Sequence, residues 1–449
     1  MKYFLLAIMI ILAALPVGDV RAETVLYEED MIGPLESPPP PPEIEVEEFP
    51  GASLHENPPG DRGPASGPVI QARRQPRGAL SGVLVFTSPG HGWVATSSGG
   101  WYTARPFLNG MVEDYGNIDQ INFFVNYCFN AGATVIPMRP VGFQTNEVVM
   151  DNTSPGVTWS GPWENSVATS NYYGRTGDLP YRFVAISAEE TAVARYTPNI
   201  PQTGYYPVYT WILPSANRVN QLYRIVTCGM ASEVRVNHRR VGQGWVWLGN
   251  YYFEAGTGGY VEISNQSDES SGYAVADAIR FGNGMGNINR GAGVSSQPRE
   301  LEASRYWVQN TIDNEVGGDK SRYDLDGYSD NDDNVGTPPR MAAYMNRSEE
   351  GTFWERIYIG FHTNCCSKRG AMGLYNSVDA PAGQIDFASA VVNEVNNDME
   401  ALDNGIGFPF DWLNNSIDLY SSNYGEIRGA SLNHEMCGTI IEVAFHDVA

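Results

Sequence analysis

Four polar side chains stand where loops leave the apolar strands of this sequence. His91 follows the run "VLVFTSPG", His362 follows "IYIGF", and Glu442 lies inside "TIIEVAF". Glu113 opens the segment "EDYGNIDQINFFVNYCFNAG", whose apolar residues have helical spacing. Ligands of α/β sheets gather at strand ends, because several loops converge there on one crevice. Two histidines and a glutamate are a common ligand set of a hydrolytic zinc, with the fourth position left to water, and a further carboxylate fits a general base.

Each of these signals is weak when it is taken alone. A single histidine at a strand end is more often a hydrogen-bonded structural residue than a metal ligand. Glu113 complements the helix macrodipole at a helix start, whether or not it binds a metal. Glu442 differs, because a carboxylate between "TII" and "VAF" is costly to bury without a partner. The reserve candidates for its role are His434, Glu435 and then His446.

The elements that must position these residues are predicted to form an α/β domain in two parts, residues 81–149 and 287–449. The first part has a uniformly apolar strand "VLVFTS", a helix and a second strand "ATVIPM". The second part has a strand "RIYIGFHTN", a helix "FASAVVNEVNNDMEAL" and a strand "GTIIEVAF". This alternation predicts a twisted, mostly parallel sheet that is flanked by helices.

Residues 150–286 have a different sequence pattern. Stretches such as "YRFVAIS", "YPVYTWIL" and "YRIVTCGMASEVRVNH" indicate short alternating strands, which Gly, Pro and Asn turns separate. The pattern predicts an all-β sandwich. Because surface loops tolerate long insertions at a small closure cost, we expect this sandwich to interrupt the α/β domain.

The N-terminal region predicts export. Residues 1–22 have the layout of a cleaved signal peptide, with a lysine, the run "YFLLAIMIILAALPV" and a small residue that ends "VRA". An uncleaved anchor is the alternative. Residues 23–80, with "ESPPPPPEIEVEEFP", are predicted to be a Pro-rich, acidic, disordered linker, or a polyproline ligand for a partner. We therefore expect a periplasmic, cell-envelope or extracellular protein.

The overall composition excludes some functions. The chain of 449 residues has a formal charge of -24, which argues against binding to nucleic acid. No later apolar run approaches the roughly 20 residues that a membrane span requires, so none is expected after signal cleavage. Five cysteines lack the regular spacing of a disulfide scaffold, and their odd number leaves at least one unpaired within the chain.

Several motifs together carry a family resemblance. "SPGHG", "EDYGN", "GATVIPMR", "RMAAYMN", "IGFHTN" and "IIEVAF" occur in the order seen in zinc-dependent N-acetylmuramoyl-L-alanine amidases of the amidase_3 type, which the chain resembles. The resemblance implies a zinc ion held by His91, Glu113 and His362. It also implies Glu442 as the catalytic carboxylate.

The amidase resemblance covers residues 81–149 and the chain from about Glu300 onward. Within "RMAAYMN", Arg340 and Asn346 match a helix that supports the sheet, and no chemistry is carried over to them. In the family a further helix follows the last strand, whereas this chain stops at Ala449. We therefore expect either a shortened ending or a fragment.

The inserted segment resembles the golvesin C-terminal-like domain. The matching stretches are "TGYYPVYTWILP", "VNHRRVGQGWVWLGNYYFEAG" and "VADAIRFGNGMG". The resemblance implies binding to a surface or a carbohydrate, for which exposed Trp or Tyr rings could stack on sugar faces. For Trp211, Trp245 and Trp247, which lie in strand patterns, packing in the core is the better interpretation.

Two further sequence motifs are candidates for metal binding. Asp324, Asp326 and Asp330 form a "DxDGxxD" arrangement that resembles a calcium loop, although Val335 stands where an EF-hand needs a bidentate acid. A solvated acidic loop is the alternative. A thiolate zinc site at the adjacent pair "CC" after "FHTN" is rejected, because neighbouring cysteines cannot easily both ligate one tetrahedral zinc.

The sequence therefore predicts a zinc amidase that cleaves the bond between the lactyl group of N-acetylmuramic acid and L-alanine in peptidoglycan. Zinc would lower the pKa of a bound water from about 15.7 towards 7, and Glu442 would take its proton. The alternative is a cell-surface or polysaccharide-binding protein with a degenerate hydrolase scaffold. A zinc hydrolase that acts on another amide is also left open.

Overall fold

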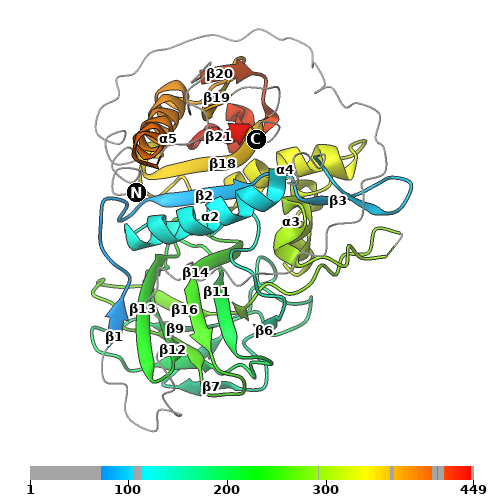
Figure 1. Ribbon diagram of the computed structural model, residues 1–449. Helices are drawn as coiled ribbons and strands as arrows, with labels where there is room; N and C mark the ends of the chain where they lie inside the picture. The colour runs from blue at the N-terminus through cyan, green and yellow to red at the C-terminus, as the bar shows by residue number, and fades with distance from the viewer. Residues whose placement is uncertain are drawn as a thin grey trace.

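The computed structural model describes residues 72–105, 113–291, 293–364, 369–406, 412 and 419–445. The predicted signal peptide, and the predicted linker as far as residue 71, lie outside these ranges. An α/β sheet with its helices lies against a β-sandwich, and helix α2 (Glu113–Asn130) runs between them (Figure 1). Among the described helices, none combines the length and the apolar content that crossing a membrane requires.

The predicted all-β sandwich is confirmed, and it contains most of the strands. Its six-stranded sheet has the order β1 (Ala72–Arg74), β13 (Met230–Asn237), β12 (Asn220–Thr227), β15 (Tyr260–Ser264), β10 (Val193–Tyr196) and β7 (Val157–Ser160). A four-stranded sheet has the order β14 (Gly244–Phe253), β11 (Gly204–Ile212), β17 (Ile279–Phe281) and β6 (Val148–Met150). A three-stranded sheet has the order β16 (Tyr273–Ala276), β9 (Arg182–Ala185) and β8 (Glu164–Asn165).

The burial of the strands follows what covers each face. In β13 buried and partly exposed residues alternate, because one face packs on the core and the other meets solvent. In β14 and β11 most residues are buried on both faces, since the α/β domain covers the face that the sandwich core does not. The tryptophans at positions 211, 245 and 247 lie in these two strands and are at most 2% exposed. They pack in the core, as the strand pattern predicted.

A row of alternating charges crosses the solvent face of the six-stranded sheet. Glu233 lies between Arg74 (2.9 Å) and Arg224 (3.3 Å), and Glu262 lies between Arg224 (3.7 Å) and Arg195 (2.7 Å). The five residues are direct partners in the strand register from β1 to β10. Opposite charges that face each other across strands stabilise this register over a slip by one residue.

Strand β1 corrects one prediction. Ala72–Arg74 were placed in the disordered linker, but they pair in parallel with β13, and the Gln75 amide donates to the Glu233 carbonyl at 2.8 Å. The segment is ordered because the exposed edge of β13 offers it backbone partners. The chain therefore contributes a strand to the sandwich before it enters the α/β sheet.

The second sheet is mixed and has the order β20 (Leu419–Ser422), β19 (Met372–Asn376), β21 (Cys437–Phe445), β18 (Arg356–Asn364), β2 (Leu84–Pro89) and β5 (Thr134–Pro137). Every neighbouring pair is parallel except β19 with β21. All six residues of β2 are buried, which is typical of a parallel strand covered on both faces. A short hairpin of β3 (Trp93–Ala95) and β4 (Trp101–Thr103) follows β2.

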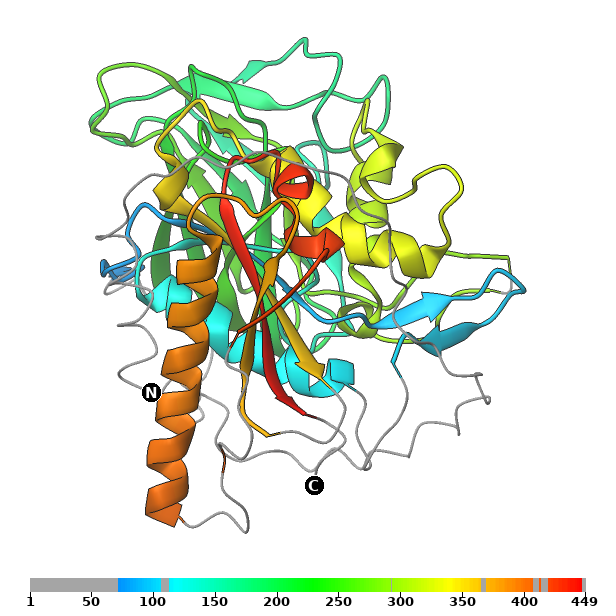
Figure 2. The same ribbon diagram turned by 90° about the horizontal axis from the view of Figure 1, so that it is seen from above.

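Helices cover this sheet. Helix α2 packs on β2 and β18, and α5 (Gln384–Ile406) runs along β19 and β21 (Figure 2). Helices α3 (Ser304–Asp313) and α4 (Asp330–Met345) pack on each other beside the sheet. The short 3₁₀ helices are η1 (Arg299–Leu301), η2 (Lys320–Arg322), η3 (Phe353–Glu355), η4 (Gly425–Ile427) and η5 (Gly429–Leu432).

The sandwich and the α/β domain share one hydrophobic core. The Tyr209 ring lies 5.6 Å from Trp307 of α3, and the Trp247 ring lies 5.3 Å from Phe129 of α2. The Tyr209 hydroxyl also accepts a hydrogen bond from the Val141 amide at 2.9 Å. Aromatic pairs at these distances contribute beyond the area they bury. The sandwich is therefore packed directly on the α/β domain.

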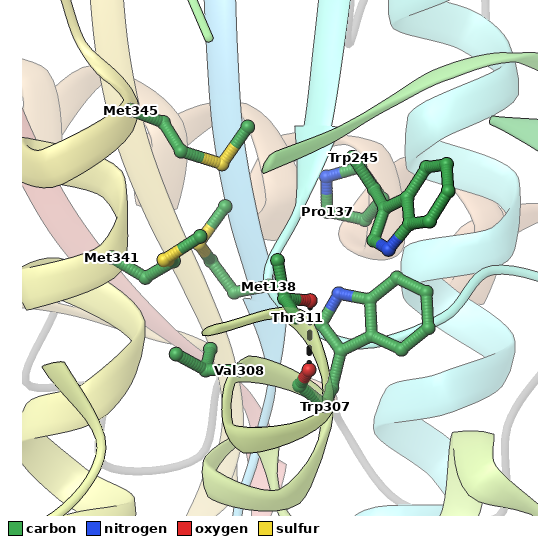
Figure 3. Close-up of a pocket in the computed structure, with 8 residues that line it drawn as sticks. All are labelled: Pro137, Met138, Trp245, Trp307, Val308, Thr311, Met341 and Met345. Atoms are coloured by element: carbon green, nitrogen blue, oxygen red, sulfur yellow. Dashed lines mark hydrogen bonds between the residues drawn. The ribbon is translucent and has the colours of Figure 1, made fainter. Parts of the chain in front are cut away.

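A small cavity marks this interface (Figure 3). Its volume is about 10 Å³, which is room for about one water molecule. It is lined by Pro137, Met138, Trp245, Trp307, Val308, Thr311, Met341 and Met345. The Thr311 hydroxyl donates to the Trp307 carbonyl at 2.9 Å, so the one hydroxyl at the cavity is satisfied within α3. The cavity is therefore too small for a ligand much larger than a water molecule.

Candidate functional site

The structure brings two of the predicted site residues together. His91 lies just beyond β2 and His362 lies in β18, and these strands are parallel, so the two residues meet at the same edge of the sheet. Their ring centroids are 4.8 Å apart with an angle of 71° between the planes, and each residue is 6% exposed. The Asn334 amide of α4 donates to the His91 carbonyl at 2.7 Å, which holds the loop in place.

The loop at His91 depends on its glycines. Gly92 has a φ of 76°, and a Cβ atom there would lie 2.6 Å from the backbone nitrogen of Ala303. Only glycine combines this conformation with so close an approach of two backbones. The sequence "GHG" therefore turns the chain sharply and leaves the imidazole at the strand end.

A glutamate that the sequence analysis missed holds His362. The Nε2 atom of His362 lies 3.0 Å from Oε2 of Glu426, and the Tyr358 hydroxyl donates to Oε1 of Glu426 at 2.7 Å. Glu426 is 4% exposed and comes from the 3₁₀ helix η4. A Cβ atom at Gly360 would lie 2.4 Å from this carboxylate, so that glycine of "IYIGF" makes room for it. In the sequence, the glycine inside this apolar strand was the indication that another group approaches the strand closely.

The other predicted site residues come from β21 (Glu442), from α2 (Glu113) and from the segment that precedes β21 (His434). Glu442 is the register partner of His362 across β18 and β21, and it is partly buried. Glu113 is the first residue of α2, and its side chain lies outside the described residues. Among the reserve candidates, Nε2 of His434 lies 3.7 Å from an oxygen of Asp379.

Glu435 and His446 are the remaining reserve candidates. Glu435 accepts a hydrogen bond from the Asn346 amide at 2.9 Å, and His446 lies outside the described residues. The amidase resemblance places Asn346 in a helix that supports the sheet and gives it no chemical role. Its contact with Glu435 is a structural one.

The described residues do not assemble a metal site. No three His, Cys, Asp or Glu side chains among them are placed to hold one ion. The Nε2 atom of His362 is also engaged by the Glu426 carboxylate. Since the side chain of Glu113 is outside the described residues, zinc binding by His91, Glu113 and His362 stays a prediction.

The predicted calcium residues have protein partners in the structure. Asp330 lies 2.5 Å from Arg290 and 3.3 Å from Arg305, and it accepts a hydrogen bond from the Tyr306 hydroxyl at 2.7 Å. Asp324 lies 3.3 Å from the same Arg305. Together with Asp326, these residues form an acidic loop that arginines neutralise in part, and calcium binding there stays a prediction.

Three buried glutamates lie in the segment that follows the sandwich. Burial raises the pKa of Glu300, Glu302 and Glu315 to about 7 in each case, against the partial opposition of nearby hydrogen bonds and arginines. The Glu302 backbone bridges to Trp93, directly behind the His91 loop. Each of these acids is more easily protonated in the folded chain than in the unfolded chain.

We expect the free energy of unfolding to fall between pH 6 and pH 8. A carboxyl whose folded pKa is raised stabilises the fold while it is protonated and loses that contribution as the pH rises through about 7. The loss is on the order of 1 kcal/mol per group over this interval. Urea denaturation at pH 6, 7 and 8 measures it. His238, whose pKa burial lowers to about 3, acts in the opposite sense, but only below about pH 6.5.

The variant Glu302→Gln separates this effect from general charge repulsion. Its amide does not titrate, so its stability should fall less between pH 6 and pH 8 than that of the wild type. Equal slopes for the two proteins would mean that Glu302 is already ionised in the fold at pH 6.

Comparisons with known proteins identify the sandwich. Residues 148–283 match the family model of the golvesin C-terminal domain. Over 150 residues the chain is 34% identical to xanthan lyase from Bacillus sp. (strain GL1), which covers 32% of this chain and 16% of that protein. The chain therefore spans less than a fifth of the length of this curated relative.

Solved structures also overlap the chain. A Paenibacillus xanthan lyase is 30% identical with a TM-score of 0.28, over 31% of this chain and 13% of that chain. A family 35 carbohydrate binding module from Clostridium thermocellum is 16% identical with a TM-score of 0.23, over 30% of this chain and 98% of that chain.

The prediction of a zinc-dependent N-acetylmuramoyl-L-alanine amidase is wrong. The curated relative is a polysaccharide lyase. The comparisons support neither zinc amidase activity for this chain nor peptidoglycan as the substrate of this chain. The physical reason is that the quoted motifs describe the strand ends of an α/β sheet, and such strand ends carry many different chemistries. The relationship that is shown concerns residues 148–283, which form a golvesin-like β-sandwich packed on the α/β sheet.

Proposed function

We propose that this protein binds a polysaccharide through its golvesin-like sandwich, and that the α/β domain is the rigid support of the sandwich. The 34% identity to xanthan lyase over 150 residues carries the proposal, because that relative is named for its action on a polysaccharide. The predicted signal peptide supports a place of action outside the cytoplasm, where such polymers occur.

The packing of the sandwich agrees with a binding role. Buried tryptophans and tyrosines fill the interface with the α/β domain, so the sandwich does not have to be ordered when a ligand binds. A rigid surface loses less conformational entropy on binding than a mobile one. The charge of -24 disfavours a strongly anionic polymer unless a local surface compensates for it.

Affinity electrophoresis of the purified protein tests the proposal. Native gels would contain xanthan, galactomannan, hydroxyethylcellulose, polygalacturonate or soluble peptidoglycan fragments, and serum albumin would serve as the non-binding control. We expect the mobility of the protein to fall with increasing concentration of at least one of the first four polymers. Unchanged mobility in all of these gels would refute polysaccharide binding, and retardation by peptidoglycan fragments alone would refute the proposed class of ligand.

A further inference from the structure

Three aromatic residues that are partly or largely exposed come from neighbouring segments of the chain, and we call them the aromatic patch: Phe143, Tyr205 and Tyr252. Gln144, the residue after Phe143, is hydrogen-bonded to the Tyr205 carbonyl. Tyr205 and Tyr252 are register partners on β11 and β14, with ring centroids 5.4 Å apart and an angle of 69° between the rings. Both are partly exposed. Phe143, on the loop between β5 and β6, is 63% exposed. The strands β11 and β14 run side by side below α2 (Figure 1).

The strand period explains why the two tyrosines face outward. Their neighbours Tyr206 and Phe253 are 0% exposed and pack on each other in the sandwich core, with ring centroids 6.1 Å apart. Successive side chains of a strand point to opposite faces, so Tyr205 and Tyr252 must lie on the other face. A large apolar residue exposed to 63%, as Phe143 is, does not contribute its full burial energy to the fold. Folding alone therefore does not account for the patch.

Carboxamide side chains surround the aromatic patch. Nε2 of Gln144 donates to the Tyr205 carbonyl at 2.9 Å. Nδ2 of Asn146 donates to the side-chain oxygens of Gln144 at 2.9 Å and Gln202 at 3.4 Å. Asn250 precedes Tyr252 by two residues on β14, and its Nδ2 lies 4.0 Å from the Cβ position of Gly142, next to Phe143.

One of these carboxamides has unused hydrogen-bonding capacity. Among the described residues, no donor reaches Oδ1 of Asn250, although this oxygen is buried. A buried acceptor without a partner costs about 1–3 kcal/mol relative to a satisfied one. A ligand hydroxyl or an ordered water would recover part of that cost.

The carboxamides beside the aromatic patch carry no formal charge. Partial burial raises the pKa of Tyr205. A carboxamide both donates and accepts hydrogen bonds, as a sugar hydroxyl does, whereas recognition of a uronate carboxylate calls for a cation. The apolar face of a pyranose ring can lie on an aromatic ring.

From this geometry we propose that the aromatic patch is the polysaccharide-binding site and that it takes an uncharged stretch of hexopyranose units. The site rests on the proposed function and specifies its ligand. The rings supply the stacking surface, and the carboxamides supply hydrogen bonds to the hydroxyl groups at the rim of each sugar.

The loop that carries Phe143 is fixed before any ligand binds. The Gly142 amide donates to Oδ1 of Asn122 on α2 at 2.8 Å. The Gln144 carbonyl accepts from the amides of Asn283 at 3.1 Å and Gly284 at 3.0 Å. These contacts reach both the α/β domain and the sandwich, so the patch is assembled from both parts and is pre-organised for binding.

The test uses the same affinity gels with the variants Phe143→Ala, Tyr205→Ala and Tyr252→Ala. The matched controls are Tyr420→Ala and Tyr328→Ala, whose side chains are 49% and 53% exposed elsewhere on the molecule. We expect a neutral polymer, galactomannan or hydroxyethylcellulose, to retard the wild type. Each patch variant should weaken that binding about threefold to tenfold, and the controls should leave it unchanged. Circular dichroism checks that every variant is folded.

The outcomes separate the two proposals. Retardation of the wild type by a neutral polymer that all three patch variants retain would refute the site while the proposed function stands. Retardation by xanthan or polygalacturonate alone, lost when the salt is raised from 0.05 M to about 0.5 M, would refute the uncharged class of ligand. Retardation by no polymer would refute the proposed function together with the site.

Discussion

The substitution Trp307→Ala is expected to lower the free energy of unfolding by about 3–5 kcal/mol. Trp307 is 3% exposed, and its ring packs against Tyr209 of the sandwich and lies 4.7 Å from the Arg280 guanidinium. The cavity it lines is already present but small, so removal of the indole would enlarge it at the centre of the interface. Urea denaturation, followed by tryptophan fluorescence and by far-ultraviolet circular dichroism, measures the loss.

The same experiment reports on cooperativity. Because one hydrophobic cluster spans both parts of the chain, the sandwich and the α/β domain should unfold in a single transition in the wild type. The control Tyr328→Ala, at a side chain 53% exposed, should change the stability by less than about 0.5 kcal/mol. A stable sandwich that persists after the α/β domain unfolds would contradict the shared core.

The substitution Glu147→Gln is expected to cost about 3 kcal/mol, since it leaves buried positive charge without its counter-charge. Its carboxylate lies 3.1 Å from Arg280 and 2.5 Å from Arg299, whose side chains are 1% and 2% exposed. Burial lowers the pKa of Arg280 to about 10, and Glu147 opposes that shift. A guanidinium keeps its proton in proteins, so the cost appears as lost stability rather than as a lost proton.

A matched change between two less buried arginines serves as the control for Glu147. Glu262 also lies between two arginines, but the side chains of Arg195 and Arg224 are 45% and 17% exposed, so both keep more contact with water than Arg280 and Arg299 do. Glu262→Gln should therefore cost about 1 kcal/mol or less. An equal loss for the two variants would mean that burial does not strengthen the interaction of Glu147 with its arginines.

Some of the site was predictable from the sequence because period and strand order are local properties. The uniformly apolar runs before His91 and His362 predicted buried strands, and such strands point their ends to one edge of a sheet. The proximity of the two rings, whose centroids are 4.8 Å apart, agrees with that rule. The turn-rich alternation after residue 150 likewise predicted the sandwich. The predicted division of the chain at residues 81, 150 and 287 stays a prediction.

The rest depends on contacts between distant parts of the chain. Glu426 stands alone in a loop sequence, and only the fold brings it within 3.0 Å of His362. The register that places Tyr205 beside Tyr252 depends on a bulge in β14, where Leu248 is left out between the pairs Val208–Gly249 and Tyr209–Trp247. Alternation along one strand does not reveal it. The functional assignment failed for a related reason. Ordered motifs fix where a sheet offers a site, whereas the substrate depends on side chains that come from elsewhere in the chain.

The parallel pairing of β1 with β13 determines how a pulling force would enter the molecule. Tension on the chain that precedes Ala72 acts along the strand axis, so the backbone hydrogen bonds between β1 and β13 would resist it together, in shear. The force would reach the sandwich before it reached the α/β sheet, since β2 lies beyond β1 in the chain. A protein held by its N-terminal segment while it grips a polymer would thus carry the tension through the sandwich and spare the strand ends at His91 and His362.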